Sequence, residues 1–167
     1  MKNCFITILI LFSASVLQAH DVARVVRVKD ADTYVLQSKQ KSFTARLANV
    51  DAPEMKQNYG VQATQNVNKL LIGKLVEFDS VGTDRYGRVL VNVWVDGARL
   101  DSLEIRNGWA WLYVNYCNDA MLAKCQAIAV NEKLGLWVCG ANAVCPPWLF
   151  RQYNYRNKLK YCKGCSK

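Results

Sequence analysis

The chain has 167 residues, a formal net charge of +9 and seven cysteines. It is long enough for one domain with a substantial core, and it contains no block of five like charges, internal repeat or low-complexity tract. These features argue against a disordered basic tail. The positive excess indicates a polyanionic partner, such as nucleic acid, lipid headgroups or acidic glycans.

The first 19 residues predict a secretory signal. Lys2 supplies the positive end, Phe5 to Phe12 form an apolar run, and Ser15 to Ala19 end in small residues. The apolar run is too short to span a membrane. We expect cleavage after Ala19, export to the periplasm or the medium, and no stable membrane association afterwards; an uncleaved membrane anchor is the alternative.

Five strands are predicted from β-branched and alternating segments. They cover residues 22–28, 33–36, 42–50, 75–80 and 89–95. The connection after the first strand is a turn at Asp30–Asp32, and Asp96-Gly97 makes a tight turn after the fifth.

A helix is predicted between the third and fourth strands, because Ala63, Val67 and Leu70 share one face and Gly73 is a natural stop. Two further helices follow the strands. Their predicted ranges are 101–107 and a segment that ends at Leu134 after a cap at Asn118 or Asp119. This order predicts an α+β fold based on a five-stranded barrel of the OB type, an architecture that binds oligonucleotides.

Carboxylates collect where two predicted strands end. Asp30 and Asp32 lie in the first turn, and Asp51 and Glu54 follow the third strand. Oxygen donors without nitrogen or sulfur partners favour Ca²⁺ or Mg²⁺. His20 is the only histidine and sits at the predicted cleavage end, so no histidine is left for a catalytic triad or a histidine-ligated zinc site.

Two arginines accompany these carboxylates. Arg46 lies on the third strand, and Arg88 ends the connection before the fifth. A guanidinium grips phosphate through two hydrogen bonds and stays charged, so acids for a metal and arginines for a phosphate predict phosphodiester hydrolysis. The structural alternatives are ion pairs of these arginines with Asp51 and Glu54, and a turn-capping role for Asp32.

Five short motifs occur in order between residue 22 and about residue 137. They are VKDADT at Val28–Thr33, R-x4-DAPE at Arg46–Glu54, YGxxA at Tyr59–Ala63, DRYGR at Asp84–Arg88 and GLW at Gly135–Trp137. In order and spacing they resemble the staphylococcal (micrococcal) nuclease-like thermonucleases. The resemblance implies an OB-fold barrel and Ca²⁺-dependent cleavage of DNA and RNA, with little sequence preference and 3′-phosphate products.

The resemblance also implies roles for individual residues. Those matching the family's catalytic groups are Arg46, Glu54 and Arg88. Those matching its metal ligands are Asp32, Asp51 and, through its backbone carbonyl, Ala52. Arg85 and Tyr86 match positions that contact the nucleotide phosphate. Tyr116 is, with Tyr86, a candidate for stacking on bases, and packing on the barrel is the alternative.

The first turn departs from the family, which has Asp-Gly-Asp where this chain has Asp30-Ala31-Asp32. A positive φ at Ala31 would be strained by about 1 kcal/mol and would loosen Asp32. The sequence therefore raises the question whether this turn is compatible with a metal site.

Six cysteines remain after signal removal, and an even number in an exported chain predicts three disulfides. They are Cys117, Cys125, Cys139, Cys145, Cys162 and Cys165. Sequential pairing (117–125, 139–145 and 162–165) closes short loops and is preferred, with a zinc site at Cys162-x-x-Cys165 as the alternative. We divide the mature chain into a nuclease-like domain (20–137) and a basic extension (138–167) packed on it as a strap.

The sequence thus predicts an exported, metal-dependent, non-specific endonuclease. We expect Ca²⁺ as its metal, with Mg²⁺ as the alternative, single-stranded DNA and RNA as preferred substrates, and a monomer. Two other functions stay open. One is an OB-fold module that binds nucleic acid without cleaving it, and the other is a basic, disulfide-stapled protein active on membranes or cell walls.

Overall fold

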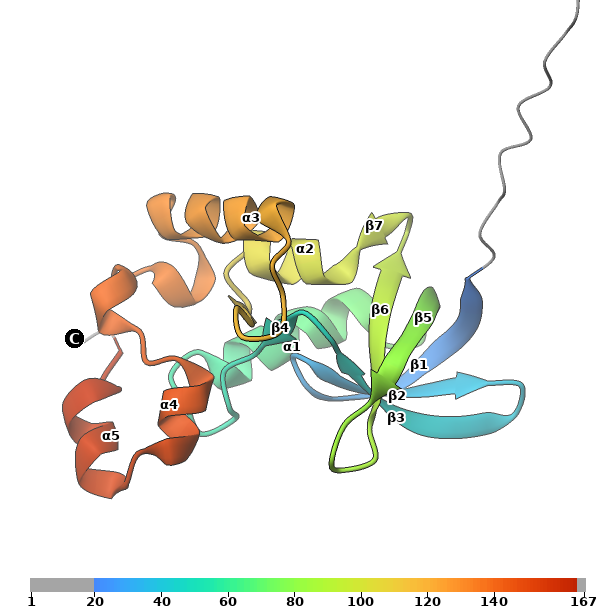
Figure 1. Ribbon diagram of the computed structural model, residues 1–167, viewed down its shortest axis with the longest axis horizontal. Helices are drawn as coiled ribbons and strands as arrows, with labels where there is room; N and C mark the ends of the chain where they lie inside the picture. Colours follow the sequence, from blue (N-terminus) through green and yellow to red (C-terminus); the bar gives the residue numbers. More distant parts are fainter. Residues whose placement is uncertain (1–19, 165–167) are drawn as a thin grey trace, which may run out of the picture.

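The structure, a computed structural model, describes residues 20–164, so the predicted signal segment and Cys165 lie outside the described part. Five strands form a closed barrel (Figure 1). They are β1 (Asp21–Asp30), β2 (Thr33–Ser38), β3 (Lys41–Leu47), β5 (Leu75–Thr83) and β6 (Val89–Val95). In the order β3-β2-β1-β5-β6 the neighbours pair antiparallel, and parallel pairing of β3 with β6 closes the barrel. The predicted OB-type barrel is confirmed.

The predicted third strand is divided in two. β3 ends at Leu47, and a turn at Ala48 and Asn49 leads into β4 (Val50–Asp51). β4 pairs with β8 (Trp111–Leu112) in a separate two-stranded sheet, while β7 (Ala98–Arg99) pairs with β6. The division turns the chain sharply between Arg46 and Asp51.

The part of the chain that the structure describes contains five α-helices. They are α1 (Gly60–Leu71), α2 (Leu100–Arg106), α3 (Ala120–Asn131), α4 (Pro147–Gln152) and α5 (Tyr155–Tyr161). The first three are the predicted helices with shifted ends, whereas α4 and α5 lie in the extension, where no helix is predicted. Two 3₁₀ turns, η1 (Gly135–Trp137) and η2 (Ala141–Ala143), connect α3 to α4. Within residues 20–164, no helix has the length and apolarity needed to cross a membrane.

The structure confirms the predicted buried face and stop of α1 and the predicted cap of α3. Ala63, Val67 and Leu71 of α1 are fully buried in the core, and Gly73 has a φ of 76° just after the helix. Asp119 caps α3 by accepting hydrogen bonds from the backbone nitrogens of the second and third helical residues. Local chemistry therefore favours the end of α1 and the start of α3.

The barrel is filled by alternate residues of its strands. Its fully or nearly buried members are Ala23, Val25, Tyr34, Leu36, Ala45, Leu47, Val76, Phe78, Val91, Val93 and Val95. A smaller cluster under η1 contains Ala129, Leu136 and Trp137. One main core thus supports both the barrel and the loops at its mouth.

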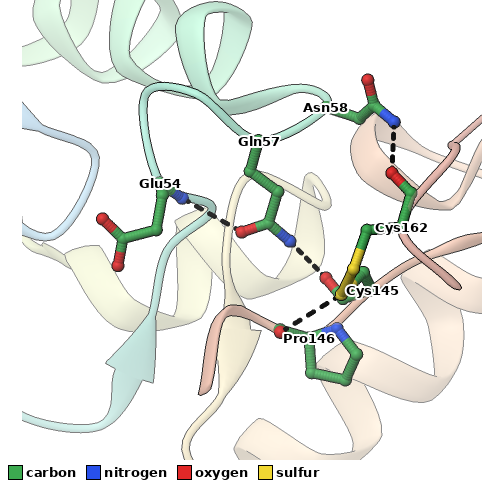
Figure 2. The surroundings of a disulfide bond; sticks show 6 residues. All are labelled: Glu54, Gln57, Asn58, Cys145, Pro146 and Cys162. Carbon is green, nitrogen blue, oxygen red and sulfur yellow. Dashed lines mark hydrogen bonds between the residues drawn. A yellow bond between two sulfur atoms is a disulfide. The ribbon is translucent and has the colours of Figure 1, made fainter. Parts of the chain in front are cut away.

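The predicted sequential disulfide pairing is wrong. Cys145 pairs with Cys162 across 17 residues, so neither pairs with its sequence neighbour (Figure 2). The reason is that α4 and α5 fill the interval and fold back on each other, which brings the two Cα atoms to 4.7 Å. Cys117 and Cys125 are free thiols in the described structure. Sγ of Cys125 instead lies among α2 and α3 side chains, 3.6 Å from Oγ of Ser102.

Candidate active site

A cavity of about 1130 Å³ opens at the mouth of the barrel. All nine residues predicted for catalysis, metal binding or nucleic-acid binding line it. They are Asp32, Arg46, Asp51, Ala52, Glu54, Arg85, Tyr86, Arg88 and Tyr116. They come from the β1–β2 turn, the β3–α1 segment, the β5–β6 connection and the segment after β8. The barrel therefore gathers four distant segments into one site.

Arg46 joins the carboxylates of the site. Its Nη2 lies 2.9 Å from Oδ1 of Asp51 and 3.2 Å from Oδ2 of Asp32. Its Nη1 donates to the carbonyl oxygens of Leu47 and Val50, each at 3.0 Å. The guanidinium thus lies inside the turn between β3 and β4. Because it is nearly buried, these hydrogen bonds fix its orientation.

Asp32 ties the β1–β2 turn to the strand end that carries Asp51. Its Oδ2 accepts a hydrogen bond from the backbone nitrogen of Ala52 at 2.9 Å, and its Oδ1 accepts one from Oγ1 of Thr33. Five non-glycine residues in the described structure have a positive φ, and Ala31 is not among them. Ala31 is fully buried, so alanine fits this turn without backbone strain.

The turn also contains a perturbed carboxyl group. Burial raises the pKa of Asp30 to about 7, and the neighbouring charge of Asp32 contributes in the same direction. Oδ1 of Asp30 accepts a hydrogen bond from the backbone nitrogen of Asp32 at 3.1 Å. Asp30 lines the cavity as well, together with Asp32, Asp51 and Asp84.

Asp84 holds Arg88 at the cavity. Nε of Arg88 donates to Oδ2 of Asp84 at 2.7 Å, and Oδ1 of Asp84 accepts from the backbone nitrogens of Tyr86 and Arg88. Nη1 of Arg88 also donates to Oγ1 of Thr33 at 3.2 Å. Since Thr33 in turn bonds Asp32, Arg88 is linked to the predicted metal-binding turn.

Asp51 and Glu54 are held by an arginine that the sequence prediction missed. Nη2 of Arg151 lies 2.8 Å from Oδ2 of Asp51, and Nη1 lies 3.2 Å from Oδ1 of Asp51 and 2.7 Å from Oε1 of Glu54. The side chain of Asp51 is only 1% exposed. Burial raises the pKa of Asp51 and the charge of Asp32 adds to this, while Arg151 and Arg46 act in the opposite direction.

Aromatic rings stand beside the charged groups. Tyr86 and Tyr116 are 69% and 76% exposed, and the guanidinium carbon of Arg85 lies 4.9 Å from the centre of the Tyr86 ring. Tyr113, which was not predicted, also lines the cavity, with its ring 5.8 Å from the guanidinium carbon of Arg46. Exposed rings next to cations suit unstacked bases.

The sequence gives unequal signals for Asp84, Arg151 and Tyr113, which line the cavity but were not predicted as site residues. Asp84 stands inside the DRYGR motif at the start of its turn, where an aspartate commonly bonds backbone nitrogens. Trp148 and Arg151 are three residues apart in α4, a spacing that places both on one helix face. Tyr113 follows β8 without a distinguishing local pattern.

The donor atoms suit a hard divalent cation. Among residues 20–164, no three His, Cys, Asp or Glu side chains converge on a common metal position. Asp32 and Asp51 nevertheless both lie within 3.2 Å of one Arg46 nitrogen, and the main chain of Ala52 adjoins them. Carboxylate and carbonyl oxygens are the ligands that Ca²⁺ and Mg²⁺ prefer, so the residues present fit such an ion.

A closed OB barrel whose mouth holds buried carboxylates between arginines defines a phosphodiester-cleaving class of protein. Residues 44–139 match the family described as staphylococcal nuclease homologue. An Escherichia coli protein named "Uncharacterized endonuclease" is 40% identical over 152 residues, which cover 90% of this chain and 98% of that protein.

Two further relatives agree with this match. A Haemophilus influenzae protein, also named "Uncharacterized endonuclease", is 33% identical over 118 residues, covering 70% of this chain and 66% of its own. A Shigella flexneri protein named "Micrococcal nuclease" is 31% identical over 139 residues, covering 77% and 79%. The chain belongs to the staphylococcal nuclease family. It is a nuclease, and its substrates are nucleic acids.

Proposed function

We propose that the protein is an exported, divalent-metal-dependent endonuclease that cleaves DNA and RNA with little sequence preference and leaves 3′-phosphate ends. One observation carries the metal-dependent chemistry. Asp32 and Asp51 meet at Nη2 of Arg46, in the same cavity as Glu54 and Arg88. A buried acidic pair beside an open glutamate and two arginines suits phosphoryl chemistry better than simple binding.

Asp32, Asp51 and the carbonyl of Ala52 would hold the cation. A bound Ca²⁺ or Mg²⁺ supplies a Lewis acid that neutralises charge on a non-bridging phosphate oxygen. The carboxylate of Glu54, 41% exposed at the cavity, orients a water molecule and accepts its proton.

Arg46 and Arg88 stabilise the negative charge that develops at phosphorus. Both guanidinium groups are held in place before substrate arrives, Arg46 by two backbone carbonyls and two carboxylates and Arg88 by Asp84 and Thr33. Such preorganised charge needs little rearrangement during the reaction. The paired N–H donors of a guanidinium group also position the phosphate for in-line attack.

Other features support export and a preference for single strands. The Cys145–Cys162 disulfide is typical of an oxidising compartment, in agreement with the predicted signal at 1–19. The exposed rings of Tyr86 and Tyr116 suit bases that are free to leave a duplex stack. The net charge of +9 favours the polyanionic backbone of either DNA or RNA.

A nuclease assay on denatured DNA and RNA with Ca²⁺, Mg²⁺ or EDTA tests the proposal. We expect cleavage with a divalent cation, none with EDTA, and 3′-phosphate ends detected by end-group analysis. Glu54→Ala and Arg88→Ala should each reduce the rate by about 100-fold or more. These side chains are partly exposed, so truncation should leave the barrel folded.

Matched controls are Glu77→Ala and Arg27→Ala, which remove the same charges from exposed positions on the barrel strands. Both should cleave at the wild-type rate. If DNA persists with every metal while a gel shift appears, the binding-module function replaces the proposed one. Leakage of anionic liposomes without nucleic-acid cleavage would instead support membrane activity. Cleavage that survives both active-site substitutions would contradict the assigned roles of Glu54 and Arg88.

A further inference from the structure

The C-terminal extension is docked on the active site through α4. Trp148 and Arg151 lie one helical turn apart in this helix. The ring of Trp148 contacts Trp111 edge-on at 5.5 Å and stacks near Tyr113 at 6.4 Å with an interplanar angle of 19°. This aromatic packing sets α4 against the β4–β8 sheet. Arg151 consequently points into the cavity.

The same extension is hydrogen-bonded to the loop that carries Glu54 (Figure 2). Nε2 of Gln57 donates to the carbonyl oxygen of Cys145, and its Oε1 accepts from the backbone nitrogen of Glu54 at 3.2 Å. Nδ2 of Asn58 donates to the carbonyl oxygen of Cys162 at 3.0 Å. The disulfide therefore lies against the loop that carries Glu54, and it closes the segment that contains α4.

Arg151 makes its contacts with atoms that the proposed function needs. Oδ2 of Asp51 is held by Nη2 of Arg151, and Oδ1 of Asp51 is shared between Arg151 and Arg46. Oε1 of Glu54 accepts from Nη1 of Arg151 at 2.7 Å. One guanidinium thus pairs with a predicted metal ligand and with the predicted water-orienting group.

A cation approaching Asp51 meets these same oxygen atoms. The guanidinium of Arg151 donates hydrogen bonds to both oxygen atoms of Asp51, and its positive charge repels a cation that approaches them, so the guanidinium and the metal ion compete for these atoms. Arg151 is 43% exposed, whereas Asp51 is 1% exposed. The arginine can therefore swing out towards solvent, while the aspartate stays buried and keeps its ion pair with Arg46.

We propose that Arg151 is a positioning residue of the nuclease site that competes with the divalent cation for Asp51 and Glu54. In the metal-free protein it neutralises the buried carboxylate and holds both side chains in place. Metal entry then requires its release. The proposal rests on the proposed function in one respect, namely that Asp51 is a metal ligand.

Calcium affinity of the mature protein without nucleic acid tests the proposal. Isothermal titration calorimetry would compare wild type with Arg151→Met, which keeps the apolar stem and removes the guanidinium. If Arg151 occupies the site for about nine-tenths of the time, only one-tenth of the molecules are open to the ion, and we expect Ca²⁺ to bind the variant about tenfold more tightly.

Arg85→Met is the matched control. It removes one positive charge from the same cavity, but Arg85 forms no ion pair within the described structure. The control therefore separates a general effect of charge on calcium affinity from a specific competition for Asp51 and Glu54. Its calcium affinity should stay within about threefold of wild type. Arg151→Lys offers a second test if the methionine variant is unstable. Lysine cannot bridge both carboxylates with a fork, so its affinity should lie between those of wild type and Arg151→Met.

Equal calcium affinities of wild type and the folded Arg151 variants would overturn the competition while the nuclease function stands. Equal gains in Arg151→Met and Arg85→Met would overturn it too, because the effect would then be charge alone. If no variant binds Ca²⁺ or Mg²⁺, the metal-dependent function itself fails together with this proposal.

Discussion

Tyr34 and Glu104 form a hydrogen bond of 2.6 Å in the interior of the protein, where neither residue is exposed. Oη of Tyr34 also lies 2.6 Å from the carbonyl oxygen of Ala31. A hydroxyl has one proton, and the Ala31 carbonyl can only accept. The Tyr34 proton therefore serves Ala31, and Glu104 supplies the proton of the other hydrogen bond. Burial raises the pKa of Glu104 well above its ordinary value, which keeps this proton in place.

Glu104→Gln should remove a pH dependence of stability. An acid whose pKa is higher in the folded state binds more protons there, so wild-type stability falls as pH rises from about 4.5 towards the folded-state pKa. Glutamine keeps a donor for Tyr34 and has no proton to lose, so the variant should be about 1–2 kcal/mol more stable than wild type at pH 8 and similar at pH 4. Urea unfolding at a series of pH values measures this. Parallel curves for the two proteins would show that Glu104 does not titrate between these limits.

Gly60→Ala should disturb the loop that carries Glu54. A Cβ atom at position 60 would lie 1.9 Å from the carbonyl oxygen of Glu54, a backbone atom that cannot move without its loop. We expect a loss of about 2 kcal/mol in the free energy of unfolding and a lower cleavage rate. Gln62→Ala, at an exposed position of the same helix, is the control and should change stability by about 0.5 kcal/mol or less. Wild-type activity and stability in Gly60→Ala would mean that this close contact relaxes freely.

Asp84→Asn should weaken catalysis without unfolding the protein. The amide removes the charged acceptor of Arg88 Nε, so the guanidinium loses its fixed direction. We expect kcat to fall about tenfold while the melting temperature changes little, because the connection is near the surface. Asp96→Asn is the control, since Asp96 forms an ion pair with Lys74 away from the cavity. Steady-state kinetics and thermal unfolding of both variants decide, and an equal loss of kcat in the control would refute a specific role for Asp84.

Removing the Cys145–Cys162 disulfide should destabilise the protein. A closed loop of 17 residues restricts the unfolded chain by about 3 kcal/mol in the chain-entropy description. The double variant Cys145→Ala/Cys162→Ala should lose about that amount in chemical unfolding. The double variant Cys117→Ala/Cys125→Ala removes two free thiols and should lose about 1 kcal/mol or less. Similar losses in the two proteins would indicate that the cross-link contributes little.

Local signals predicted a large part of this fold. The helical period of α1, the Asp119 cap of α3 and the alternation of the barrel strands depend on neighbours a few residues away. The five motifs depend on spacing within short segments, and the structure places their charged residues, apart from Lys29, in one cavity. Local signals did not predict the two helices of the extension. α4 and α5 are short, and their stability comes from docking and a disulfide.

The sequence by itself singled out carboxylates and arginines that line the cavity, since charged residues at strand ends are visible without coordinates. Only the tertiary structure decided their distances. A straight strand would separate Arg46 and Asp51 by up to about 17 Å. The turn after Leu47 reduces the gap between their charged atoms to 2.9 Å. Arg151 reaches Asp51 from 100 residues away. Chain spacing sets only an upper limit on a distance, whereas barrel closure and packing of α4 determine which groups meet.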